Sequence, residues 1–136
     1  MSFVLDNSVA MAWCFEDEAT EYADRILDRL VSEAALTPAI WPLEAANAVL
    51  VGARRQRLQL ADTVRFLDLL RSLPIAVAAL PLDQAMGPVL ELARTFTLSA
   101  YDASYLELAM REGVPLATQD ARLRVAATAA GVSLAT

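Results

Sequence analysis

Short apolar runs alternate with amphipathic helical segments along this chain, and the alternation restricts the possible folds more than any other feature. Buried strands are expected at residues 2–6, near 36–37, and at 75–80, 114–118 and 132–134. Helices are expected to begin near Ser8 and to cover about 19–34, 42–53, 62–73, a stretch around 86–93, 99–113 and 120–129. Strands that alternate with helices form a mostly parallel sheet with helices on both faces. The sequence therefore predicts an α/β fold with a short, mostly parallel sheet flanked by helices.

The length and apolar content indicate how the chain is organised. With 136 residues and 57% hydrophobic side chains, the chain can bury one core and is short for two ordinary domains, so residues 1–136 are expected to form one domain. The longest charge-free stretches, 72–82 and 125–136, fall short of the roughly 18 residues of a membrane span. Asp6 interrupts any apolar leader. We expect a cytoplasmic protein without a membrane segment.

Several residue types are missing or rare, and their absence excludes whole classes of site. The chain has no histidine, and all 11 basic residues are arginine. Serine–histidine relays, imidazole-ligated zinc, the lysine of a Walker A phosphate loop and Schiff-base chemistry are therefore excluded. The 4 glycines form no dinucleotide-binding cluster, and the single Cys14 permits no internal disulfide. Carboxylate and hydroxyl chemistry remain.

Four isolated acids, each expected in the first turn of a helix, are the candidate catalytic residues: Asp6, Glu44, Asp102 and Asp120. Taken singly, each has an ordinary structural explanation, because an acid at a helix N-terminus is stabilised by the exposed N–H groups and the dipole. Asp6 and Asp120 follow predicted strands, and a doubtful strand at 97–98 precedes Asp102. Such positions converge beyond the carboxyl ends of parallel strands. Grouped carboxylates among apolar neighbours are costly unless a cation or proton neutralises them, so the set predicts a metal site.

The chemistry of these ligands selects the metal. Oxygen ligands without imidazole or thiolate favour Mg²⁺ or Mn²⁺, which suit phosphodiester hydrolysis. Ser8 and Thr118 lie two residues from Asp6 and Asp120 and could bind metal waters or the scissile phosphate. An N-cap and a strand-end hydroxyl are equally good explanations of these two residues.

The charge balance bears on a nucleic-acid partner. The net charge of −6 argues weakly against one, since phosphate binding normally requires a basic face. The charges are segregated, however, because acids crowd residues 16–33 whereas Arg54, Arg55 and Arg57 cluster later. A basic patch can therefore persist despite the net sign.

Four segments that contain the candidate acids resemble the motifs of the PIN-domain ribonucleases, and more narrowly of the VapC-type toxins of bacterial toxin–antitoxin pairs. They are residues 4–10 (VLDNSVA), 41–50 (WPLEAANAVL), 98–109 (LSAYDASYLELA) and 115–123 (PLATQDARL). The resemblance runs the full length, and its specific parts are Y-D-A at 101–103 and T-x-D at 118–120. Asn7 occupies a position where small residues are common, and the lack of lysine leaves RNA binding to arginine alone.

The resemblance implies a PIN-like three-layer fold and a metal-dependent endoribonuclease. Such proteins are usually dimeric and are inhibited by a small antitoxin that inserts a segment into a hydrophobic groove. We expect RNA hydrolysis through one or two Mg²⁺ or Mn²⁺ ions bound by Asp6, Glu44, Asp102 and Asp120. The weaker candidates for holding the RNA backbone are Arg54, Arg55, Arg57 and Arg122.

Two other interpretations compete with this one. A phosphoacceptor signalling domain is also α/β with acids at strand ends, but it uses paired early acids and a late lysine, and this chain has neither. A catalytically silent PIN scaffold that only binds a partner would not need the intact acid set.

A partner surface is expected on two amphipathic helices. The segments 19–34 and 43–53, with Trp13, Phe15 and Trp41 nearby, have apolar residues to spare for a groove that accepts an antitoxin helix and for self-association. Burial of these aromatic residues in the core explains them equally well.

Overall fold

The computed structural model describes residues 1–136 and confirms the predicted α/β architecture. In chain order the elements are β1 (Ser2–Leu5), α1 (Asn7–Cys14), the 3₁₀ turn η1 (Glu16–Glu18), α2 (Glu21–Arg29), β2 (Ala34–Thr37), α3 (Trp41–Arg54), α4 (Leu60–Ser72), β3 (Ile75–Val77), α5 (Leu82–Gln84), the π turn η2 (Ala85–Val89), α6 (Leu90–Phe96), α7 (Ala100–Glu112), β4 (Leu116–Ala117) and α8 (Ala121–Ala129).

The four strands form one parallel sheet in the order β3-β2-β1-β4. Val4 of the central strand β1 lies opposite Leu36 of β2 on one side and Leu116 of β4 on the other. The strand expected at 132–134 is reduced to a single parallel bridge between Leu116 and Leu134. Because the strands run in one direction, their carboxyl ends meet at the same edge of the sheet.

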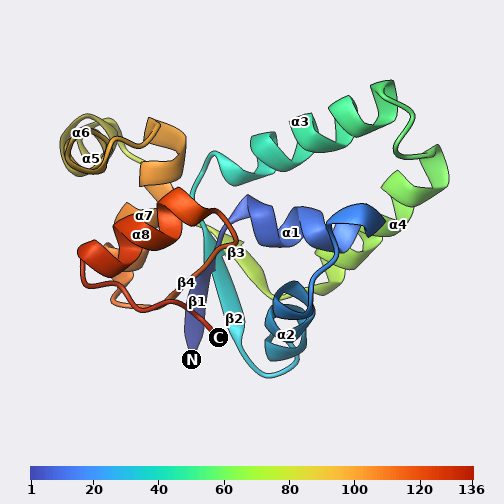
Figure 1. Ribbon diagram of the computed structural model, residues 1–136, viewed down its shortest axis with the longest axis horizontal. Coiled ribbons are helices and arrows are strands. Elements are labelled where there is room, and N and C mark those ends of the chain that lie inside the picture. Colours follow the sequence, from blue (N-terminus) through green and yellow to red (C-terminus); the bar gives the residue numbers. More distant parts are fainter.

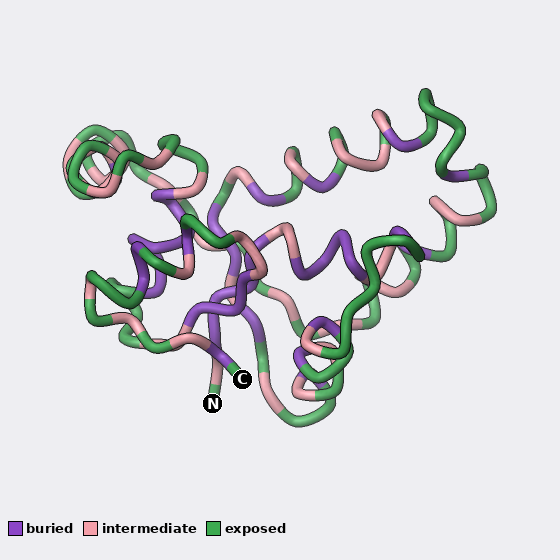
Figure 2. Tube along the Cα trace, in the orientation of Figure 1, coloured by how far each residue is buried: buried purple, intermediate pink, exposed green.

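Helices cover both faces of the sheet and give three layers (Figure 1). The helices α6, α7 and α8 lie on one side, and α1 to α4 lie on the other, with the α3–α4 hairpin reaching furthest from the strands. A cluster of 26 buried hydrophobic residues joins the layers. Figure 2 shows the buried positions concentrated in the strands and in α1 and α7, whereas the hairpin is mostly exposed or half-buried. None of the helices has the length and apolarity that crossing a bilayer requires.

Local capping explains where the helices of the site begin. The expectation that Ser8 caps α1 is wrong, because the N-cap is Asp6, whose side chain accepts from the Ser8 N–H. Ser99 caps α7 and Asp120 caps α8. Helix α7 ends at Gly113, whose φ of 65° lies in the left-handed region that glycine adopts readily.

Three expected elements differ from those observed. The helix expected at 19–34 covers only Glu21–Arg29, since a turn follows and Ala34 already belongs to β2. The strand β3 is shorter than the expected 75–80 and lies at an edge of the sheet, so Ala76 and Val77 are exposed rather than buried. No strand precedes Asp102, because Thr97 is left-handed and terminates α6.

Pro88 lies inside a continuous helical segment instead of in a first turn. Helical structure begins at Leu82, and Pro88 falls in the π turn η2, between α5 and α6. A proline removes one helical hydrogen bond and crowds the preceding turn, and the wider π turn accommodates both effects.

The α3–α4 hairpin is anchored to α1 at its tip. Gly52 of α3 contacts Phe15, and a Cβ built on Gly52 would lie 2.6 Å from the Phe15 ring. Arg57, in the connection between α3 and α4, lies 4.2 Å from the centroid of the Phe15 ring. Only glycine permits this approach of helix to ring, so residue 52 is fixed by packing.

Candidate active site

Asp6 lies directly after β1, at the carboxyl edge of the sheet, and is only 5% exposed. Its Oδ2 accepts hydrogen bonds from the Ser8 hydroxyl at 2.6 Å and from the Thr118 hydroxyl at 2.8 Å. Its Oδ1 has no protein donor. Burial raises the pKa of the Asp6 carboxyl, the two hydroxyl donors oppose that rise, and the charge of Asp102 adds to it.

Glu44 comes from the first turn of α3, where Pro42 also lies, and its side chain is half-buried. Its Oε1 accepts from the Tyr105 hydroxyl at 2.6 Å, whereas Oε2 has no protein donor. Burial raises the pKa of Glu44, Tyr105 opposes the rise, and the charges of Asp6 and Asp102 add to it. Glu44 therefore faces the other acids.

Asp102 and Asp120 lie at the starts of α7 and α8. The Asp102 backbone N–H donates to the hydroxyl of Ser99 at 3.1 Å, and Asp120 Oδ1 accepts from the Leu123 N–H at 3.0 Å. Burial raises the pKa of Asp102, with a further rise from Asp120, while Ser99 and the Arg122 guanidinium lower it. Asp120 thus caps α8 as expected, whereas the Asp102 carboxylate accepts no backbone N–H and the Ser99 hydroxyl caps α7. The charges of the two acids repel each other.

The four acids thus form one electrostatically coupled group. Asp6 interacts with Asp102, Glu44 with both, and Asp102 with Asp120. No arginine forms an ion pair with any of them. The other buried carboxylate, Glu107, has a basic partner, Arg111, at 2.9 Å. The charge of Glu107 is therefore balanced by an arginine, whereas none of the four acids has such a partner.

The donor set of this site fits a hard divalent cation. All of its candidate ligands are carboxylate oxygens, and Asp6, Glu44 and Asp120 each keep one oxygen without a protein donor. The hydrogen-bond donors that hold these three carboxylates are neutral hydroxyl and backbone groups, so the negative charge is not cancelled. The side chains do not, however, form a group of three or more acids already close enough to bind one ion.

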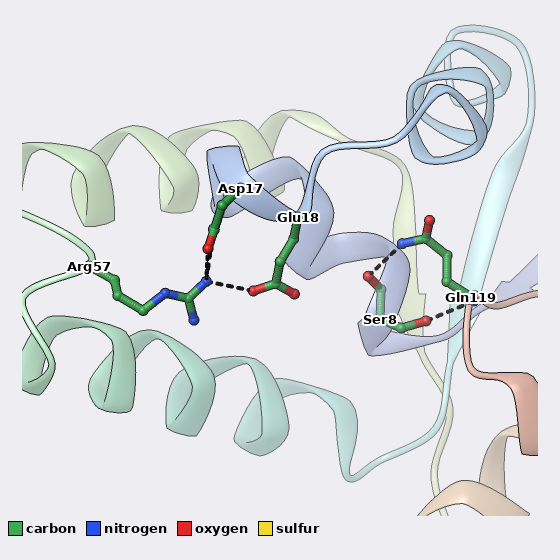
Figure 3. Close-up of polar contacts among 5 residues, drawn as sticks. All are labelled: Ser8, Asp17, Glu18, Arg57 and Gln119. Atoms are coloured by element: carbon green, nitrogen blue, oxygen red, sulfur yellow. Dashed lines mark hydrogen bonds and ion pairs between the residues drawn. The ribbon is translucent and has the colours of Figure 1, made fainter.

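Ser8 and Thr118 both support Asp6 directly, and a third residue joins them. The Gln119 backbone N–H donates to the Ser8 hydroxyl at 2.9 Å, and its side-chain Nε2 donates to the Ser8 carbonyl at 3.2 Å (Figure 3). Its Oε1 accepts from Thr20, the N-cap of α2, at 2.6 Å. Gln119 thereby ties the loop after β4 to the starts of α1 and α2.

Gln119 and Tyr105 were not among the residues predicted for the site. Gln119 occupies the variable position of the T-x-D segment, and nothing in its own sequence context indicates its partners. Tyr105 gives a usable signal, because it lies one helical turn after Asp102 on a face of buried residues, and a buried tyrosine hydroxyl needs a partner. Burial, the hydrogen bond to Glu44 and the charge of Asp6 raise the pKa of Tyr105 well above its usual range, so it remains a neutral donor.

The four arginines predicted to hold RNA are placed in different surroundings. Arg57 is bound to Asp17 at 2.8 Å and to Glu18 at 2.9 Å (Figure 3), so its guanidinium is already occupied. Arg54 and Arg55 are exposed and have no ion pair. They lie at the end of α3, about 15 Å along the helix axis from Glu44 at 1.5 Å per residue. Arg122 is exposed in the first turn of α8, and it is the one of the four whose charge lowers the pKa of a site acid, Asp102.

The apolar groove lies between α3 and α4, so the expected segment 43–53 contributes to it and the expected segment 19–34 does not. Its cavity of about 740 Å³ is lined by 14 residues, of which 11 are hydrophobic, including Trp41, Val49, Phe66 and Leu70. Of the other two aromatic residues expected there, Phe15 is buried beneath Gly52, and Trp13 is half-buried with its indole N–H bound to the Ala23 carbonyl at 2.8 Å. The short α2 packs on α1 and leaves α4 as the second wall of the groove.

Comparisons with known proteins add a family and two similar structures. The family model described as PIN domain matches residues 3–129. The crystal structure of PAE2754 from Pyrobaculum aerophilum has 29% sequence identity and a TM-score of 0.68, over 93% of this chain and 79% of that one. A chain of VapBC2 from Rickettsia felis, crystallised with a DNA fragment from their promoter, has 12% identity and a TM-score of 0.70, over 99% of this chain and 98% of that one. At 12% identity the second likeness concerns the fold alone. No curated protein sequence matched.

Proposed function

We propose that this chain, which belongs to the PIN domain family, is a metal-dependent endoribonuclease that hydrolyses RNA phosphodiester bonds. One observation supports the proposal above all others. Four carboxylates linked by pairwise repulsion lie at the carboxyl edge of a parallel sheet, and none of them forms an ion pair with a basic side chain. A divalent cation is the partner that these acids lack.

The proposed roles follow from the contacts. Asp6, Glu44, Asp102 and Asp120 hold Mg²⁺ or Mn²⁺, while the hydroxyls of Ser8 and Thr118 orient Asp6. When bound, the ion supplies charge for a phosphate oxygen and lowers the pKa of a water molecule. Arg122 is placed to contact the RNA backbone because it is exposed, free of ion pairs and close enough to lower the pKa of Asp102.

A cleavage assay with metal removal tests this function. Cleavage of a mixed-sequence RNA should require added Mg²⁺ or Mn²⁺, should stop with EDTA and should return when metal is restored. Sequencing the ends of the products then identifies the cleavage site. Activity that survives exhaustive chelation would end the metal hypothesis. A folded protein that binds Mn²⁺ and cleaves no RNA would favour a silent scaffold.

We further propose that the chain is the toxin of a toxin–antitoxin pair and that the α3–α4 groove receives an apolar helix of the antitoxin. The apolar lining of the groove and its cavity of about 740 Å³ support this proposal, since amphipathic helices bind in such grooves through an apolar face. The similarity of fold to a chain of VapBC2 is consistent with it.

The same hairpin supports a proposal of self-association. Leu43, Leu50, Leu60, Val64 and Leu67 on α3 and α4 are large hydrophobic residues between 45% and 80% exposed. Patches of this kind on a protein surface usually mark an interface. Light scattering should therefore show a dimer at micromolar concentration, whereas a monomer, both alone and with the cognate antitoxin, would contradict both partner proposals.

A further inference from the structure

Tyr105 connects two layers of the molecule at the proposed metal site. It lies on α7, is completely buried, and donates its hydroxyl proton to Glu44 Oε1 on α3 at 2.6 Å. The two residues are 61 positions apart in the chain, and α3 and α7 lie on opposite sides of the sheet (Figure 1). The hydrogen bond is thus a tertiary link at the carboxyl edge of the sheet.

Glu44 has no other protein group to hold its side chain in place. Tyr105 is the only donor to its carboxylate, which is half-buried and is repelled by Asp6 and Asp102. Glu44 also has more rotatable bonds than the three aspartates, so it loses more conformational freedom when it is fixed. Without the hydrogen bond, repulsion and solvation would both favour rotation of Glu44 away from the other acids.

The tyrosine hydroxyl is well suited to this task because it is neutral. An arginine in its place would fix Glu44 but would also cancel the charge, as Arg111 does for Glu107. Tyr105 occupies Oε1 and leaves both the charge and Oε2 available. Outer partners of this kind fix the orientation of a metal ligand and support its affinity.

We infer that Tyr105 is a positioning residue, which holds the Glu44 carboxylate toward Asp6 and Asp102 so that the four acids can share a divalent cation. The inference rests on the proposed function, because it concerns the same site. Tyr105 itself contacts neither the metal nor the RNA.

The direct experiment measures Mn²⁺ binding by titration calorimetry on the full chain. Tyr105→Phe keeps the ring and removes only the hydroxyl, and it should weaken Mn²⁺ binding by about 10-fold or more. Tyr101→Phe is the matched control, because Tyr101 lies one turn earlier on α7, is 61% exposed and has no side-chain hydrogen bond. A folded Tyr105→Phe protein with the affinity of the wild type would overturn the inference.

A thermodynamic cycle separates positioning from a general structural role. In a Glu44→Gln background the carboxylate is already absent, so adding Tyr105→Phe should reduce Mn²⁺ affinity much less than it does in the wild type. An equal loss in both backgrounds would show that Tyr105 acts through the fold and not through Glu44. If wild type binds no Mn²⁺ and cleaves no RNA, the proposed function itself fails. If wild type does both and Tyr105→Phe binds equally well, only the inference fails.

A measurement on the wild-type chain keeps the inference testable if Tyr105→Phe does not fold. Ring resonances of Tyr105 in selectively labelled protein should shift on saturation with Mg²⁺, because the Glu44 carboxylate that accepts its hydrogen bond gains the ion as a second partner. Tyr22, whose hydroxyl donates to the Ala135 carbonyl at 2.7 Å, serves as the internal reference. Tyr105 resonances that do not move at saturating Mg²⁺ would contradict the inference.

Discussion

The acidic site and the apolar groove are built on the same helix, and they differ in the groups that they leave unbalanced. The site has unpaired charges, and the groove has exposed apolar side chains. Helix α3 presents Glu44 to the acids, while Trp41, Val49 and Leu50 of the same helix line the groove. At the acidic site, buried and half-buried carboxylates have no basic side chain paired with them. In the groove, apolar groups are exposed without a surface to cover them. Each imbalance is the reason for the partner proposed for that region, a divalent ion in one case and an apolar helix in the other.

If the two regions serve different partners, substitutions in them should have separate effects. Asp6→Asn should reduce RNA cleavage by at least about 100-fold, the scale on which a single catalytic group acts. The metal-free variant should be as stable as wild type or more so, because burial disfavours the charged form of Asp6 and Asn can still accept from Ser8 and Thr118. Cleavage assays and urea unfolding measure the two effects. A variant that is both less stable and fully active would contradict the description of Asp6.

Substitution in the groove should leave the metal site unaffected. Leu50→Glu, on a residue that is 45% exposed and lines the groove, should weaken partner binding or self-association by about 2 kcal/mol, or roughly 30-fold, as for a central interface residue. Mn²⁺ affinity should not change.

Val31→Glu is the matched control for this variant. Val31 is 88% exposed and follows α2, outside the groove. Sedimentation velocity, with and without the antitoxin, should show an effect for Leu50→Glu only. Equal effects of both substitutions would show that added charge, not loss of a groove contact, is responsible.

The comparison also requires the groove to be a rigid feature of the unbound protein. Gly52→Ala tests this, because the new Cβ would meet the Phe15 ring at 2.6 Å and loosen the anchored tip of the hairpin. We expect a destabilisation of about 1–3 kcal/mol in urea, typical of overpacking. Gly87→Ala is the control, since a Cβ at residue 87 would have no other atom within 4 Å. If the two variants are equally stable, the contact of Gly52 with Phe15 does not hold the hairpin.

The smallest effect is expected at Arg57, which was predicted to bind RNA and instead bridges Asp17 and Glu18. Its side chain is 39% exposed, so Arg57→Gln should cost little stability, and the cost should decrease at high salt. RNA affinity should stay at the wild-type value, while Arg122→Gln should weaken it. Fluorescence anisotropy with a labelled RNA and Asp120→Asn as a non-cleaving background measures both. A large loss at Arg57 alone would reverse these assignments.

The sequence predicted those parts of the structure that depend on local rules. The strand at Ser2–Leu5 and the helices expected at 42–53, 99–113 and 120–129 all follow from short-range patterns. The alternation of strands and helices was enough to predict the parallel sheet, and the parallel sheet implied that Asp6 and Asp120 end at one edge.

The remaining features depend on contacts between distant residues. The role of Tyr105 follows from a partner 61 positions away, and that of Gln119 from partners on α1 and α2. The position of the groove depends on the length of α2. This helix ends at Arg29, although the helical spacing of apolar residues continues to residue 34. The π turn at Pro88 depends on helical structure that begins six residues earlier. Periodicity along one segment contains none of this information.

The central claim is that the four acids act as one metal site, and stabilisation by Mg²⁺ tests it most directly through Asp120. Asp120→Asn preserves the cap on α8, because asparagine caps a helix about as well as aspartate, and removes only the charge. Bound ligand stabilises the folded protein by RT ln(1 + [L]/Kd), about 2.7 kcal/mol at 100 times Kd. Differential scanning calorimetry should show a rise in the Tm of wild type with Mg²⁺, a much smaller rise in Asp120→Asn, and equal or higher stability of the variant without metal. An Asp120→Asn protein that keeps the full Mg²⁺ shift and its ribonuclease activity would show that Asp120 is only a cap and would contradict the account.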